Sequence, residues 1–109
     1  MKPTHIVLHE YAGDAWRGRI VDGDAVDEVE RWLAALEARP REAPASGKPL
    51  AWLYLGTLSD DRLRATRSVG VQTDVLRALD RGLLPGELEE LLAIFDRHGQ
   101  PFDGAIDRA

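Results

Sequence analysis

Two short segments near the start of the chain have the hydrophobic pattern of strands, the first as an apolar run and the second by alternation. Residues 5–11 read HIVLHEY and residues 16–21 read WRGRIV, with arginines at alternate positions of the second segment. The β-branched and apolar residues of the first segment predict a strand, and the two-residue period of the second predicts a half-buried strand with its arginines toward water. The link over residues 12–15 is short and contains Gly13 and Asp14, so we expect the two strands to form a hairpin.

A helical period replaces this alternation after residue 22. Apolar residues then recur every three or four positions, which predicts an amphipathic helix that ends at Pro40. Asp24 is the expected cap, because short acidic side chains accept hydrogen bonds from the first free N–H groups of a helix. The apolar stripe of this helix consists of Val26, Val29, Trp32, Leu33 and Leu36.

The middle of the chain contains a loop and two apolar segments. Residues 40–49 (PREAPASGKP) hold three prolines and have no periodicity, so they predict a mobile surface loop. Residues 50–58 (LAWLYLGTL) are nearly all apolar, as in a central strand that is covered on both faces. Residues 62–71 fit either a helix or a strand. Gly70 and the lack of a helical stripe favour a strand whose one face carries Leu63, Ala65, Arg67, Val69 and Val71.

Two helices and a docking tail are expected in the remaining part. Residues 73–82 predict a short helix, and residues 86–99 predict a longer one with an apolar face of Leu88, Leu91, Leu92 and Phe95. In the tail, the candidates to dock onto the core are Phe102 and Ile106. The element order ββα, ββ, αα predicts an α+β fold, with a small single-layer, mostly antiparallel sheet packed with two to three helices.

Composition and charge narrow the functional classes. A chain of 109 residues has the usual size of one domain, so we expect a single domain over residues 1–109. It contains no cysteine, which excludes disulfides and cysteine-based metal sites or nucleophiles. The first apolar run is too short for a signal peptide and no later run has the length of a membrane span, so we expect a cytoplasmic protein. A net charge of −5 disfavours broad binding to a phosphate backbone.

The titratable residues form no recognisable catalytic or metal motif. His5 and His9 lie four apart on a predicted strand, and about 3.3 Å per residue puts them about 13 Å apart, too far for one metal ion. Glycine-rich phosphate loops, nucleophile elbows and zinc-protease signatures do not occur in the sequence. We therefore expect no metal and no cofactor. The residues from which a small hydrolase or isomerase site could still assemble are His5, His9, Glu10, Asp14 and His98.

Five arginines on predicted strands form a candidate anion-binding surface. If both hairpins belong to one sheet, these guanidinium groups would line a face or an edge and bind carboxylates or phosphates through paired hydrogen bonds. The competing interpretation is a solvated face balanced by nearby aspartates. The arginines are Arg17, Arg19, Arg62, Arg64 and Arg67.

Tryptophans and a tyrosine provide a second candidate surface. Trp16, Trp32 and Trp52 lie on predicted core faces, so core packing is expected for each. Tyr54 shares a face with Trp52. If the chain itself does not cover that face, the pair is a candidate anchor for a partner. An unprotected sheet edge also predicts a homodimer or a hetero-complex formed through the sheet.

Three hypotheses for the function follow. The first is a non-enzymatic protein-binding module, namely a small inhibitor, immunity or adaptor protein that acts by occluding a partner's surface. The second is a nucleic-acid or phosphate-ligand binder that uses the arginine-lined face. The third is a small hydrolase or isomerase with a site of histidine, aspartate and glutamate. The residue pattern favours the first, while enzymatic activity stays open.

Overall fold

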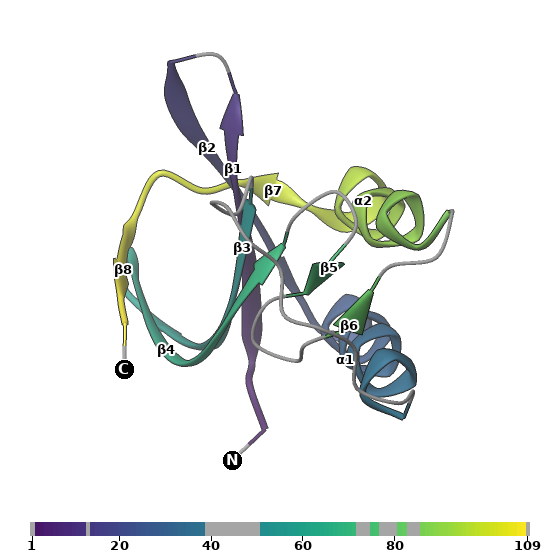
Figure 1. Cartoon of the computed structure of the whole chain (residues 1–109). Coiled ribbons are helices and arrows are strands. Elements are labelled where there is room, and N and C mark those ends of the chain that lie inside the picture. Colours follow the sequence, from purple (N-terminus) through teal and green to yellow (C-terminus); the bar gives the residue numbers. More distant parts are fainter. Residues whose placement is uncertain are drawn as a thin grey trace.

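The computed structural model of the chain describes residues 2–12, 14–38, 51–71, 75–76, 81–82 and 86–108. A curled sheet has two helices on one side (Figure 1). The elements in chain order are β1 (His5–Ala12), β2 (Ala15–Asp22), α1 (Asp24–Glu37), β3 (Ala51–Ser59), β4 (Arg62–Val71), β5 (Val75–Leu76), β6 (Arg81–Gly82), α2 (Glu87–His98), β7 (Gln100–Pro101) and β8 (Ala105–Asp107).

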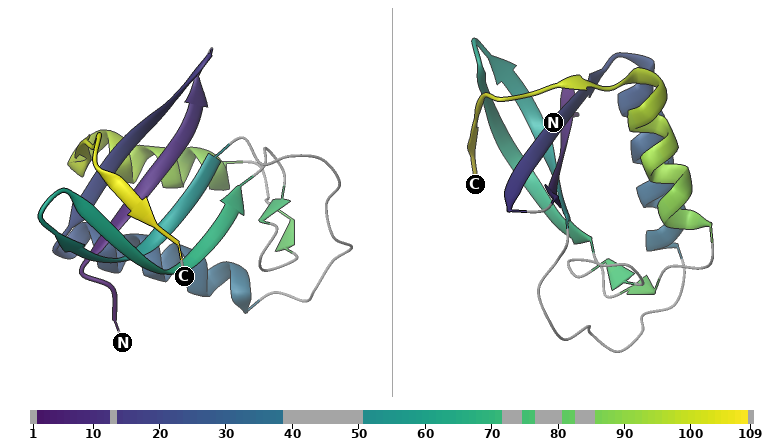
Figure 2. Two further views of the ribbon diagram at one scale, coloured as in Figure 1. Left: turned by 90° about the vertical axis from the view of Figure 1, so that its left-hand side faces the viewer. Right: turned by 90° about the horizontal axis from the view of Figure 1, so that it is seen from above.

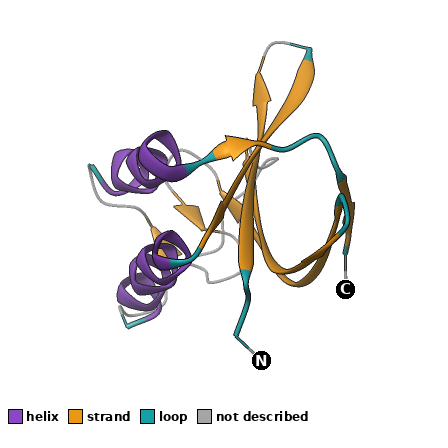
Figure 3. Cartoon of the chain, turned by 180° about the vertical axis from the view of Figure 1, so that it is seen from behind, coloured by secondary structure: helices purple, strands orange, loops and turns teal. Residues whose placement is uncertain are grey.

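The sheet is mixed and mostly antiparallel. Its strand order is β6-β5-β4-β3-β1-β2-β7, and β8 pairs with β4 in parallel outside this path. Both helices cover one face, and the chain that follows α2 crosses the hollow face of the curl (Figures 2 and 3). We call residues 100–108 the strap, because β7 pairs with β2 and β8 pairs with β4. The α+β fold expected from the sequence is confirmed.

The two faces of the sheet carry separate apolar clusters. The first cluster fills the space between helices and sheet and includes Ile6, Leu8, Leu53 and Val69, which are each at most 1% exposed. The second cluster lies on the hollow face and is built on Val7, Tyr54, Leu63 and Ala65, with Phe102 and Ile106 of the strap packed against it. The expected docking of Phe102 and Ile106 is therefore confirmed.

The N-terminal hairpin and the two helices form where the sequence predicts them. All five residues of the predicted α1 stripe are buried. On the predicted face of α2, Leu91 and Phe95 are buried, and Leu88 and Leu92 are half-buried. The expected cap of α1 is wrong, because Gly23 occupies the N-cap position and Asp24 is the first helical residue. Among the described residues, neither helix is long and apolar enough to cross a membrane.

A β-bulge divides β4 into two halves that bury opposite faces. Arg67 pairs with Leu55, but the next pair joins Ala65 to Gly56, so Thr66 is the extra residue. This insertion reverses the alternation of side chains. Leu63 and Ala65 consequently join the second cluster, whereas Val69 and Val71 join the first. The strand at residues 62–71 is confirmed, but its single apolar face is wrong.

The short helix predicted at residues 73–82 is also wrong where the structure describes this segment. Residues 75–76 and 81–82 are strands, and β5 pairs with both β4 and β6. Sheet pairing overrides the weak local preference for a helix here. The loop predicted at residues 40–49 lies outside the described residues.

Candidate functional site

A row of aromatic side chains runs across the hollow face from the tip of the β1–β2 hairpin to β3. In the hairpin, Tyr11 pairs with Trp16 and His9 pairs with Gly18. His9 also pairs with Trp52 of β3. Since side chains alternate along each strand, this register brings rings from three strands to one face. We call this set the aromatic row: Tyr11, Trp16, His9, Tyr54 and Trp52.

Neighbouring rings in the row are in contact range. The Tyr11 and Trp16 centroids are 5.3 Å apart, and the His9 ring stacks on Trp16 at 5.1 Å with an interplanar angle of 25°. The Tyr54 centroid lies 6.3 Å from His9 and also 6.3 Å from Trp52, and the planes of Tyr54 and Trp52 differ by only 17°. These separations are typical of stabilising aromatic pairs.

The strap divides the row into an exposed end and a covered end. Tyr11 and Trp16 are 52% and 44% exposed, whereas Tyr54 is 1% exposed. Between them lies a cavity of about 380 Å³, which takes in His9, Trp16 and Tyr54 together with Asp103 and Arg108 of the strap. The aromatic row therefore extends from the exposed pair Tyr11 and Trp16 into this cavity.

Gly18 allows the strap to approach the hairpin. The amide of Phe102 donates a 2.9 Å hydrogen bond to the Gly18 carbonyl. A Cβ atom at position 18 would lie 2.5 Å from the Phe102 carbonyl oxygen and 3.6 Å from the His9 ring. Any larger residue would push the strap away, so this glycine is what permits close contact between strap and row.

Burial shifts the titration of two members of the row. Partial burial, and secondarily the positive charge of Arg108, lowers the pKa of His9. Burial raises the pKa of Tyr54, although Arg108 partly opposes that shift by its charge and by a hydrogen bond to Tyr54. The row therefore favours a neutral imidazole beside a neutral phenol at neutral pH.

The two predicted anchors occupy different environments. Trp52 is half-buried at the covered end of the row, so its role in partner binding stays a prediction. Tyr54 lies under the strap, because Phe102 and Ile106 complete the cluster around it. The expectation of core packing is confirmed for Trp32 but wrong for Trp16, which is 44% exposed.

The sequence interpretation missed the exposed end of the row. Tyr11, His9 and Trp16 were each placed on a strand, but their common face was not recognised. The short hairpin link already aligns Tyr11 with Trp16, so hairpin register was the signal that could have found them.

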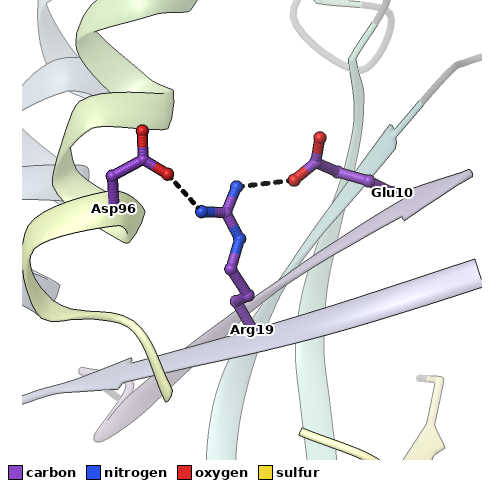
Figure 4. Close-up of polar contacts among 3 residues, drawn as sticks. All are labelled: Glu10, Arg19 and Asp96. Atoms are coloured by element: carbon purple, nitrogen blue, oxygen red, sulfur yellow. Dashed lines mark hydrogen bonds and ion pairs between the residues drawn. The ribbon is translucent and has the colours of Figure 1, made fainter. Parts of the chain in front are cut away.

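The five predicted anion-binding arginines have separate surroundings. Arg19 binds Glu10 at 2.6 Å and Asp96 of α2 at 2.5 Å (Figure 4). Arg67 pairs with Glu37 of α1, and Arg62 pairs with Asp107 of β8 at 2.7 Å. Arg17 and Arg64 are exposed.

Carboxylates thus already partner three of the five arginines. Arg17 and Arg19 also line a second cavity of about 620 Å³ on the helix side of the hairpin, which three carboxylates share, those of Glu10, Asp96 and Asp103. This mixture of charges weakens the attraction of that cavity for an anion. Anion binding by the arginines stays a prediction.

The residues considered for a hydrolytic site do not gather at one place. His9 faces the aromatic row, while its neighbour Glu10 binds Arg19 beside α2. His98 is the last residue of α2 and lies 3.3 Å from Glu28 of α1. Within the described part of the chain, no group of three or more such side chains is placed to hold a metal ion.

The chain matches no protein-family model, no curated protein and no solved structure.

Proposed function

We propose that this chain is a non-enzymatic protein-binding domain that acts by covering a surface of its partner, as inhibitor, immunity and adaptor proteins do. The observation that carries the proposal is the exposed end of the aromatic row. Tyr11 and Trp16 are the large hydrophobic side chains that the described residues expose. They lie side by side on a hairpin that projects beyond the body of the sheet (Figure 1).

The form of this feature suits protein recognition. Tyrosine and tryptophan dominate binding energies at protein interfaces, because they bury a large area at a small cost in side-chain entropy. Stacking on His9 already restrains Trp16 in the free chain, which lowers that cost further. A preorganised aromatic pair on a projecting hairpin can enter a recess in a partner without rearrangement of the sheet.

Charge indicates which partners are favoured. The chain carries a net charge of −5, and exposed acids flank the hairpin, namely Asp14 in its turn and Asp103 of the strap. Complementary potentials raise association rates and select against acidic partners. We therefore expect a partner with a basic rim around an apolar recess.

Affinity capture with hairpin variants tests the proposal. Wild-type chain should retain a protein at stoichiometric amounts from a native lysate, and Trp16→Ser should weaken that binding by about 2 kcal/mol, or about 30-fold. Tyr11→Ser should also weaken the binding of this protein. The matched control is Arg17→Ala, since Arg17 is the adjacent residue, is also exposed, and lies beside Arg19 on the opposite face of β2.

The outcomes separate the hypotheses. Loss of binding in the aromatic variants but not in Arg17→Ala supports the proposal. Loss in Arg17→Ala, with nuclease-sensitive material in the wild-type eluate, supports an anion binder instead. Sedimentation of the wild type at micromolar concentration shows whether the bound protein is a second copy of the chain. A strictly monomeric wild type that retains no protein overturns the proposal.

A further inference from the structure

A cation from the strap occupies the covered end of the aromatic row. The guanidinium carbon of Arg108 lies 5.7 Å from the ring centroid of Trp52 and 5.4 Å from that of Tyr54. The two rings are nearly parallel, so together they present one extended π surface to the guanidinium. Distances below about 6 Å from a ring centroid are those of cation–π attraction.

We propose that the Trp52–Tyr54 face is a binding seat for an arginine side chain of the protein partner, and that Arg108 occupies this seat in the free chain. The inference rests on the proposed function, since it names the chemical group that the partner contributes. In this arrangement the chain carries its own competitor. A partner arginine binds by replacing Arg108 on the two rings.

The chemistry of the seat matches a guanidinium group. A planar, delocalised and weakly hydrated cation can stack on both rings at once, whereas a compact ammonium group stays better hydrated. Tryptophan is the strongest aromatic partner for a cation. The seat thus distinguishes arginine from lysine.

The surroundings of the seat also favour a cation. Asp103 lines the cavity that also takes in Tyr54 and Arg108, and the chain as a whole is acidic. The remaining nitrogen base in the cavity is His9, whose lowered pKa keeps its imidazole neutral at neutral pH. An incoming arginine therefore replaces one positive charge with another and meets no additional one from the row.

Arg108 is placed so that it can leave. Arg108 is exposed and directly follows β8, which ends at Asp107. The Arg108 side chain can therefore move outward while Asp107 stays paired with Arg64 of β4. Trp52 is only half-buried, so part of the residue remains accessible. Exchange at the seat thus requires a side-chain movement and leaves the sheet intact.

A peptide titration followed by NMR tests the inference. The probe is a short blocked peptide with one central arginine, and its counterpart carries lysine at the same position. The signal is the indole N–H resonance of Trp52. In Arg108→Ala, from which the competitor is absent, the arginine peptide should bind at least about twofold tighter than in wild type, the factor expected for an exposed cation–π contact.

Two further variants complete the design. Arg31→Ala is the matched charge control. Arg31 is exposed on α1, away from the strap, and its removal lowers the net charge of the chain by one, as the removal of Arg108 does. Trp52→Leu removes one of the two rings of the seat. The peptide should then cause no chemical-shift changes in the other residues of the aromatic row. Arg108→Ala alters only an exposed side chain, so it stays informative even if Trp52→Leu fails to fold.

Saturable shifts at Trp52 that are stronger in Arg108→Ala than in Arg31→Ala, and stronger for arginine than for lysine, support the inference. Equal binding by the two alanine variants, equal binding of the two peptides, or no shift at Trp52 in any variant overturns it. Such a failure leaves the proposed function standing if capture still depends on Trp16. Peptide binding at Trp52 without any captured protein would instead mean that the seat binds arginine but that the proposed function fails.

Discussion

Substitution of Gly18 by alanine should detach the strap from the hairpin. The added Cβ atom would lie 2.5 Å from the Phe102 carbonyl oxygen, about 0.9 Å closer than the 3.4 Å at which ordinary contact begins. The obstacle is a backbone atom, so no rotamer change relieves the clash. The strap has to move, and that movement breaks the 2.9 Å hydrogen bond from the Phe102 amide to the Gly18 carbonyl.

The size of the effect follows from these two losses. Overpacking in a closely packed site costs about 1–3 kcal/mol, and a broken backbone hydrogen bond contributes about 0.5–1.5 kcal/mol. We therefore expect Gly18→Ala to lower the free energy of unfolding by about 2–4 kcal/mol. In a domain of this size the melting temperature should fall by at least about 8 °C, at about 4 °C per kcal/mol.

Thermal denaturation and amide hydrogen exchange measure this effect together. The amides of the strap, above all that of Phe102, should exchange faster in Gly18→Ala, and Tyr54 should become accessible as its cover moves. The control is Arg17→Ala, because Arg17 is the neighbouring residue on β2 and its side chain is exposed. Unchanged stability together with unchanged exchange at Phe102 would refute the role assigned to Gly18.

Two further predictions concern the core and the pH dependence. Leu91 of α2 is fully buried, so Leu91→Ala should lower the free energy of unfolding by about 2–5 kcal/mol; an unchanged denaturant midpoint would contradict this packing. Burial and the charge of Arg108 lower the pKa of His9, so the unfolded chain binds that proton more readily than the folded one. The resulting stability is fully present above about pH 6.5, the ordinary pKa that His9 keeps in the unfolded chain, and is lost as the pH falls from there through the lowered pKa of the folded state. Urea midpoints at about pH 7.5 and about pH 5.5 should therefore differ less in His9→Gln than in wild type, and an equal difference would contradict the assignment.

Local sequence patterns were enough to predict five of the elements. Alternation identifies β2, apolar runs identify β1 and β3, and helical stripes identify α1 and α2. The interruption of β4 could not be predicted in this way. Thr66 fits an unbroken alternation in the sequence, and its status as an extra residue depends on the partner strand, where Leu55 and Gly56 bracket the bulge.

Pairing between distant segments explains the remaining differences. Residues 75–76 are strand because Leu76 pairs with Val71, which a window over residues 73–82 cannot show. In the candidate site, too, one part could be predicted from local sequence and another could not. A two-residue period already placed Trp52 beside Tyr54, but the approach of Arg108 to both rings depends on the path of the strap across the sheet.

The strap also determines when, during folding, strands of the sheet are protected from pairing with other chains. It pairs Gln100 with Ile20 on β2 and Ile106 with Leu63 on β4, so the last described segment protects strands formed much earlier in the sequence. Contacts between such distant residues form slowly, since a long loop must close first. Until the strap docks, the unpaired parts of β2 and β4 offer free backbone groups to any neighbouring strand. Aggregation during refolding should therefore depend on chain concentration until the strap has docked, and this interval is the vulnerable period of the molecule.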